Sequence, residues 1–166
     1  MIALKISNKK DFMSKLLKSE LFDDFFAEEI TIDTFNTFHI DGRIHKDFYK
    51  DTAEAEVQTD LQDFSRWQDL KAICFDLIKG KRTPLSLKFV FHAPADIKKT
   101  LLTSADAGLS ENQVKLGVNI RFSNSDVVLT TGTAFSIFSL DKEIEKAWDN
   151  YIPSFLDKSG ISCEIL

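Results

Sequence analysis

Alternating apolar and polar residues predict most of the strands of this chain, because successive side chains of a strand point to opposite faces of a sheet. The longest case runs from Val114 to Phe122, where every second residue is apolar. A turn at residues 123–126 follows, and a second apolar stretch then runs back, with a bulge expected at Gly132. The predicted strands are residues 2–6, 27–44, 85–91, 114–122, 127–140 and 161–166.

The segment 27–44 is long enough for a hairpin, and Asp41-Gly42 is its strongest turn signal. A three-residue loop with Gly42 in the left-handed conformation pairs Phe38 with Ile44 and keeps the apolar residues on one face. We favour this loop over a two-residue loop, which gives a different register.

A spacing of three and four residues between apolar positions predicts four helices. The clearest one begins at Ser65 and ends at Gly80, which suits a C-cap. Its apolar stripe consists of Trp67, Leu70, Ile73, Cys74, Leu77 and Ile78. The other helices are expected from Ser7 to Leu17, from Pro94 to Gly108, and from Asp141 to Pro153, which kinks or ends the last one.

Together these elements predict an α+β fold, in which a mostly antiparallel sheet built from hairpins packs against about four helices. The element order is β-α-β-β-α-β-α-β-β-α-β. Residues 1–166 are expected to form a single domain, since 166 residues is a typical size for one core. Residues 46–62 are acidic and lack periodicity, so we expect a mobile surface loop there. The order β-α-β-β-α-β occurs twice, but no sequence identity decides whether the halves are a duplication.

Composition supports a folded protein with no strong attraction to polyanions or membranes. Hydrophobic residues are 43% and charged residues 28% of the chain, and 15 phenylalanines supply bulky core side chains. The formal net charge of -5 does not support nucleic-acid binding, and no run of 18 apolar residues predicts a membrane span. Cys74 and Cys163 lie among apolar residues without metal-ligand spacing, so we expect reduced, buried thiols and a cytoplasmic protein.

No motif that names a reaction is present in the sequence. It lacks the phosphate-binding loop, the glycine pattern of dinucleotide sites, the zinc-protease motif, the nucleophile elbow and the EF-hand loop. We therefore expect no cofactor and no metal site. The substrate or ligand, the biological partner and the oligomeric state are left open by the sequence.

The densest polar cluster lies around the expected hairpin tip and contains His39, Asp41, Arg43 and His45. Such a cluster can supply an acid, a base and an anion clamp to a small enzyme. In the favoured register His39 lies diagonal to His45, and diagonal neighbours are about 7 Å apart. A shared metal would then need a further ligand, so we favour a solvated hairpin tip and keep the small enzyme as an alternative.

A second cluster contains the cations Lys79, Lys81 and Arg82, in the loop between the clearest helix and the strand that follows it. This loop, residues 79–83, is a candidate site for an anionic ligand. Cations in the last turn of a helix also interact favourably with the helix dipole, by about 0.3–1 kcal/mol and without any ligand. Both interpretations of the loop remain open. A weaker candidate is the hydroxyl-flanked glycine of residues 130–133.

The segments TFNTFHIDGR, CFDLIKGKRTPLSLKFVF and TTGTAFSIFSLDKEIEKAW resemble those of an uncharacterised family of small bacterial proteins, a domain of unknown function. The resemblance covers most of the chain and implies no catalytic residue and no ligand. The order of helices and hairpins is also similar to a DNA sliding-clamp unit, by fold analogy only. We expect a non-catalytic binding or accessory module of the bacterial cytosol, with an anionic ligand at residues 79–83. The alternatives are a small enzyme using His39 and His45, and a sliding-clamp-like nucleic-acid accessory protein.

Overall fold

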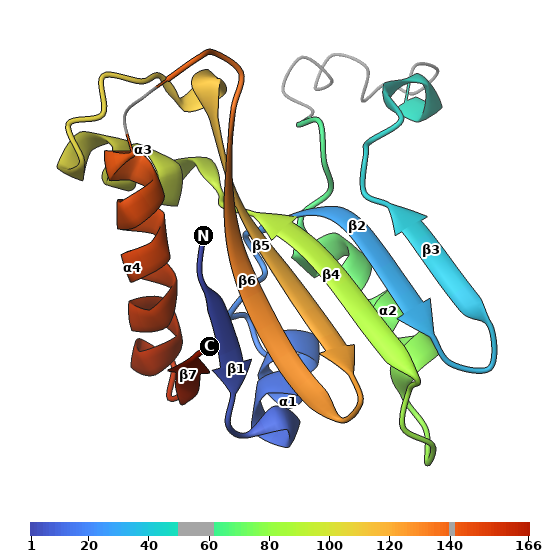
Figure 1. Cartoon of the computed structure of the whole chain (residues 1–166). Coiled ribbons are helices and arrows are strands. Elements are labelled where there is room, and N and C mark those ends of the chain that lie inside the picture. Colours follow the sequence, from blue (N-terminus) through green and yellow to red (C-terminus); the bar gives the residue numbers. More distant parts are fainter. Residues whose placement is uncertain (50–61, 140–141) are drawn as a thin grey trace.

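A computed structural model of the chain describes residues 1–49, 62–139 and 142–166, which form one sheet with helices packed against it (Figure 1). The strands of this described part are β1 (Ala3–Ile6), β2 (Phe26–Asp33), β3 (Thr37–Asp41), β4 (Ser86–His92), β5 (Val114–Ser123), β6 (Asp126–Phe135) and β7 (Cys163–Ile165). Its α-helices are α1 (Lys9–Lys18), α2 (Trp67–Ile78), α3 (Ala95–Ser104) and α4 (Glu143–Lys158). The described residues also form two short 3-10 helices, η1 (Lys46–Tyr49) and η3 (Glu111–Gln113).

The seven strands follow the order β3-β2-β4-β5-β6-β1-β7, and every neighbouring pair is antiparallel. Three of the pairings, β2–β4, β6–β1 and β1–β7, join strands that are not consecutive in the chain. The first strand, β1, therefore lies between β6 and β7, the last two strands. The predicted α+β class, the antiparallel sheet and the element order are confirmed.

The β5–β6 hairpin has the longest strands of the sheet, and two residues form its turn. Asn124 and Ser125 have positive φ angles of 50° and 63°, as a two-residue type I′ turn requires, and the twist of that turn matches the strands. The turn predicted at residues 123–126 is confirmed. The bulge predicted at Gly132 is wrong, because Gly132 pairs in regular register with Gly117.

The hairpin predicted at Asp41-Gly42 is also wrong, because the chain turns earlier, at residues 34–36. Pairing of Phe38 with Ile32 keeps the apolar side chains on one face, and this pairing fixes the position of the turn. Gly42 instead follows β3 and packs against β2. The amide of Gly42 donates to the carbonyl oxygen of Glu28 at 3.0 Å. The absence of a side chain at Gly42 therefore allows this segment to approach β2 closely, and it is not required for a turn.

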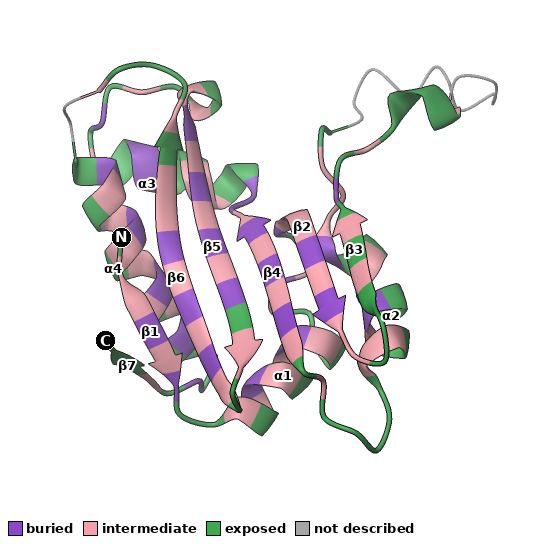
Figure 2. Ribbon diagram, turned by 45° about the vertical axis from the view of Figure 1, so that its right-hand side comes forward, coloured by how far each residue is buried: buried purple, intermediate pink, exposed green. Residues whose placement is uncertain are grey.

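The core fills the space between one face of the sheet and the helices. Figure 2 shows α1 and α2 behind the sheet, with buried residues alternating along the strands. Trp67 of α2 lies 5.4 Å from the ring of Phe89 and 5.2 Å from that of Phe91, which are neighbouring core positions of β4. Its indole nitrogen donates to the carbonyl oxygen of Leu16 at 2.8 Å and so ties α2 to α1. These contacts show that α2 packs directly on β4.

Two details of the helices differ from the sequence prediction. Ile73 was expected in the apolar stripe of α2, but its side chain is 55% exposed. Pro153 does not end α4, which continues to Lys158 because Leu156 is still buried in the core one turn later. The indole of Trp148 on α4 donates to the carbonyl oxygen of Gly117 on β5 at 2.8 Å, which anchors this helix to the middle of the sheet.

Two sequence expectations concern segments that the structure describes only in part. The mobile loop expected at residues 46–62 falls mostly on residues 50–61, which lie outside the described residues, and Lys46–Tyr49 forms η1. The helix start expected at Asp141 also lies outside them. None of the described helices is both long enough and apolar enough to cross a membrane.

Candidate functional site

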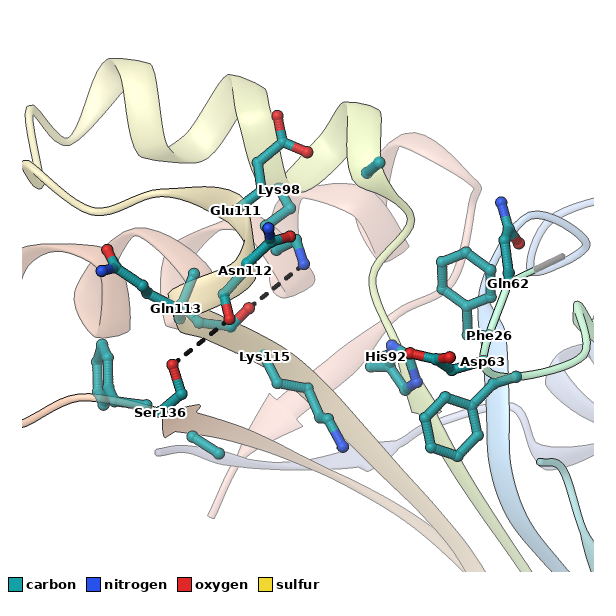
Figure 3. A pocket seen from close by; sticks show the side chains of 15 residues that line it. Phe26, Gln62, Asp63, His92, Lys98, Glu111, Asn112, Gln113, Lys115 and Ser136 are labelled. Carbon is teal, nitrogen blue, oxygen red and sulfur yellow. Dashed lines mark hydrogen bonds between the residues drawn. The ribbon is translucent and has the colours of Figure 1, made fainter. Parts of the chain in front are cut away.

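A cavity of about 710 Å³ opens at the end of the sheet where β4 ends and β5 begins (Figure 3). We call it the His92 cavity. Its floor is the open face of the strands, and α3 and η3 border it. The residues that line it are Phe26, Gln62, Asp63, Phe64, His92, Ala95, Lys98, Glu111, Asn112, Gln113, Val114, Lys115, Ala134, Phe135 and Ser136.

Aromatic rings enclose His92 on two sides, and sheet register places both of them. Phe26 of β2 is the cross-strand partner of His92, and the two rings lie 5.2 Å apart. Phe64 lies edge-on to the imidazole at 5.0 Å, held there by an isolated bridge between Arg43 and Phe64. The segment that follows β3 and the segment that precedes α2 therefore build this wall of the cavity together.

Burial controls the chemistry of His92. Its Nε2 atom is buried and makes no hydrogen bond to any described residue. Desolvation, assisted by the positive charges of Lys115 and Lys98 and opposed by Glu28, lowers the pKa of His92 to about 4. The imidazole is therefore neutral at physiological pH. Its Nε2 atom is an unused hydrogen-bonding group enclosed beside two aromatic rings, at the edge of a cavity whose other lining residues are largely polar or charged.

Two lysines reach into the same cavity from different elements. Lys98 of α3 donates to the carbonyl oxygen of Val114 at 3.3 Å. Burial lowers the pKa of Lys98, the carboxylate of Glu111 opposes that shift, and the ammonium group of Lys115 adds to it. Figure 3 shows Lys98 and Lys115 on one side of the opening, with Phe26 and His92 on the other.

The charges around these lysines are compensated unequally. Lys115 donates to a carboxylate oxygen of Glu28 at 3.2 Å, and its ammonium group lies 5.3 Å from the centre of the Phe64 ring. Asp63, at the rim, pairs with Lys46 at 3.3 Å. Lys98 forms no ion pair within the described part of the chain, although the carboxylate of Glu111 in the same lining interacts with its charge.

The structure does not bring the predicted histidine cluster together with this cavity. His39 lies exposed on β3, where its Nδ1 shares a hydrogen bond of 3.3 Å with the hydroxyl of Thr31. His45 is exposed in the loop before η1, and the amide of Arg43 donates to Asp41 at 3.0 Å. These residues are not at a hairpin tip, because the turn is at residues 34–36. Neither histidine lines the His92 cavity, and their role in a small enzyme stays a prediction.

The cations of the 79–83 loop are exposed between α2 and β4, at the end of the sheet opposite the His92 cavity. Lys79 is the C-cap of α2 and pairs with Asp76 at 2.8 Å. Lys81 and Arg82 make no ion pair with a described residue. Anion binding at this loop stays a prediction. Within residues 1–49, 62–139 and 142–166, no three His, Cys, Asp or Glu side chains are grouped as metal ligands.

Sequence reasoning missed His92, Lys98 and Lys115. One weak signal was present: His92 and Lys115 occupy the polar positions at the ends of two alternating strands, where side chains face away from the core. Only the pairing of β4 with β5 shows that these two ends meet. The contribution of α3 depends on the angle at which the helix leaves β4, which no spacing in the sequence encodes.

Comparison with curated proteins and comparison with solved structures each give no significant match. A family model does match, and it covers residues 15–164, which include the described strands and α-helices except β1, the start of α1 and the last residue of β7. The lining of the His92 cavity lies entirely inside this range. The chain belongs to the family of unknown function DUF5721.

Proposed function

We propose that the protein is a non-catalytic binding module that holds a small organic anion in the His92 cavity. The main support is His92, whose Nε2 atom is buried with no partner among the described residues and whose pKa is lowered by burial and, to a smaller extent, by the charges of Lys115 and Lys98 across the opening. An unsatisfied buried polar atom costs about 1–3 kcal/mol. A ligand that accepts or donates one hydrogen bond there removes that cost.

The charge distribution favours a negative group on the ligand. Lys98 is partly buried and has only a neutral carbonyl oxygen as hydrogen-bond partner. An anion beside it restores the interactions that its ammonium group loses on burial. Lys115 lies close enough to affect the pKa of Lys98, and so it reinforces the attraction even though Glu28 compensates part of its charge.

The aromatic wall favours a flat ring on the same ligand. Phe26 and Phe64 flank His92 with ring centroids 5.2 and 5.0 Å from the imidazole. An aromatic ring of a ligand adds stacked or edge-to-face contacts to this group. A cavity of about 710 Å³ is within the range of small-molecule sites. An aromatic carboxylate and an aromatic phosphate share this chemistry.

Binding fits the state of His92 better than acid–base catalysis does. A general base works best when its pKa is near the operating pH. The pKa of His92 is lowered to about 4, so its imidazole is a weak base at neutral pH and serves as a hydrogen-bonding group. We infer a cytoplasmic location, because Cys74 and Cys163 are free thiols and free thiols are typical of reducing compartments.

Calorimetric titration with a panel of aromatic carboxylates and nucleoside monophosphates tests the proposal. We expect at least one of these compounds to bind the parent protein, and Lys98→Met to weaken that binding about tenfold through the lost charge-assisted contact. The matched control is Lys99→Met, which removes the same charge from the next position of α3, outside the lining of the His92 cavity. Lack of binding by every compound, or equal binding by Lys98→Met and the parent, contradicts the proposal.

A further inference from the structure

A second cavity, of about 300 Å³, lies at the end of the sheet opposite the His92 cavity. It is bordered by α1, by the C-terminal end of α2, by the start of β4 and by the β5–β6 turn. We call it the basal groove. Its walls are mostly apolar and are formed by Met13, Leu17, Ile78, Pro84, Leu87 and Phe122.

Cations surround the mouth of the basal groove. Lys9 and Lys10 of α1 are part of its lining, which contains no carboxylate. Lys9 donates to the backbone carbonyl oxygen of Ser125, a neutral partner that leaves its charge uncompensated. Lys10 is exposed and makes no ion pair with a described residue. The α1 side of the groove is therefore positive.

The 79–83 loop adds positive charge on the other side. Ile78, Thr83 and Pro84 line the groove, and Lys81 and Arg82 precede Thr83 by two residues and by one residue. Both side chains are exposed and have no ion-pair partner in the described residues. Leu85, next in the chain, is 69% exposed and extends the apolar surface beside the groove. The protein has a formal net charge of -5, so the positive charge around the groove is opposite in sign to that of the whole chain.

We propose that the basal groove is a docking site for an acidic amphipathic segment of a partner protein. A large apolar side chain of that segment enters the groove between α1 and Pro84, and the acidic residues on either side of it meet Lys10, Lys81 and Arg82. Charge complementarity of this kind steers association and selects the partner. The site is separate from the His92 cavity and does not depend on the function proposed for that cavity.

The combination of walls and rim favours a peptide over the other anions that cations attract. A nucleic acid or a polyphosphate uses only the cations and leaves the apolar walls in contact with water. A fatty acid uses both, but a small-molecule site normally buries most of its ligand, and about 300 Å³ is at the small end of such sites. A peptide needs to bury only one anchoring side chain, and its backbone stays in solvent.

Selection of short random peptides displayed on phage against the whole protein tests this docking site. We expect the selected peptides to combine acidic residues with Leu, Ile or Phe. Their affinity, measured by fluorescence anisotropy, should fall about tenfold in Lys81→Ala/Arg82→Ala and should decrease with added salt. Met13→Gln, which makes one apolar wall polar, should weaken the same peptides.

The matched control is Lys99→Ala/Lys158→Ala, which removes two exposed cations of α3 and α4 and should leave the affinity unchanged. The proposal is overturned if no peptide is selected, or if the selected peptides bind Lys81→Ala/Arg82→Ala as well as the parent. It is equally overturned if a single-stranded oligonucleotide displaces the peptides and binds Met13→Gln undiminished, since the groove is then a polyanion site without an apolar anchor.

Discussion

Gly42 lies so close to β2 that a Cβ atom on it would stand 1.7 Å from the carbonyl oxygen of Ala27. At this point the register of β2 against β4 shifts between Ala27 and Glu29. The amide of Ser65 donates a hydrogen bond to the carbonyl oxygen of Gly42 at 2.8 Å. The amide of Ala27 in turn donates to the carbonyl oxygen of Ser65 at 2.9 Å. These two hydrogen bonds hold the segment before α2 against β2 and so place Phe64 beside His92. The wall of the His92 cavity therefore depends on the absence of a side chain at Gly42.

Gly42→Ala should therefore destabilise the protein strongly. The new methyl group meets backbone atoms, which cannot rotate away as a flexible side chain does, so we expect a loss of about 3 kcal/mol or more in the free energy of unfolding measured in urea. Gly132→Ala is the control, because a Cβ atom there meets nothing within 4 Å. Equal stability of the two variants would show that Gly42 is not tightly packed.

Phe89→Ala tests the centre of the core. Phe89 is fully buried and packs edge-on against Trp67 at 5.4 Å. Truncation leaves a cavity under α2, so we expect a loss of about 3–5 kcal/mol in the free energy of unfolding. Phe138→Ala makes the same exchange at a side chain that is 87% exposed and should cost less than about 0.5 kcal/mol. A loss below 1 kcal/mol for Phe89→Ala would contradict the central position of β4.

The alternation of apolar residues was sufficient to predict the sheet, because core positions of a strand must recur with a period of two. It located β4, β5 and β6 and the turn between β5 and β6, which the structure shows to be a type I′ turn at Asn124 and Ser125. The prediction failed at Asp41-Gly42. This dipeptide is typical of a turn, but in the structure Gly42 allows close packing against β2. Local turn preference is weak compared with the cross-strand pairing of Phe38 and Ile32, and tertiary packing decided between them.

The His92 cavity was beyond sequence reasoning for a different reason. Its lining comes from segments that are distant in the chain and meet only through sheet pairing, such as Phe26 with His92. A polar residue at the end of a strand normally faces solvent, and nothing local to His92 shows that Phe64 covers it. The burial that lowers the pKa of this imidazole therefore appears only in three dimensions.

Thiol labelling distinguishes the two cysteines, which were both predicted to be buried. Burial raises the pKa of Cys74 to about 12, whereas Cys163 is only partly buried on the edge strand β7, where burial raises its pKa to a lesser extent. Because the thiolate is the reactive form, we expect Cys163 to react with a disulfide reagent at pH 8 and Cys74 to react only after unfolding. The variant Cys163→Ser should then show no labelling in the native state. Rapid labelling of that variant would show that α2 does not protect Cys74.

The lowered pKa of His92 makes stability depend on pH in a defined direction. The folded-state pKa is about 4, below the ordinary 6.5 of the unfolded chain, so below pH 6.5 the unfolded state binds the proton first. The contribution of His92 to the free energy of unfolding is complete above pH 6.5 and is lost as the pH falls toward 4. Between pH 7 and 4.5 we expect the parent to lose about 2 kcal/mol more in the free energy of unfolding than His92→Gln, which has no titrating ring. His39→Gln is the matched removal of an exposed histidine. Equal losses in the parent and His92→Gln would mean that the imidazole is not held neutral, and the hydrogen-bonding role proposed for its Nε2 atom would then be withdrawn.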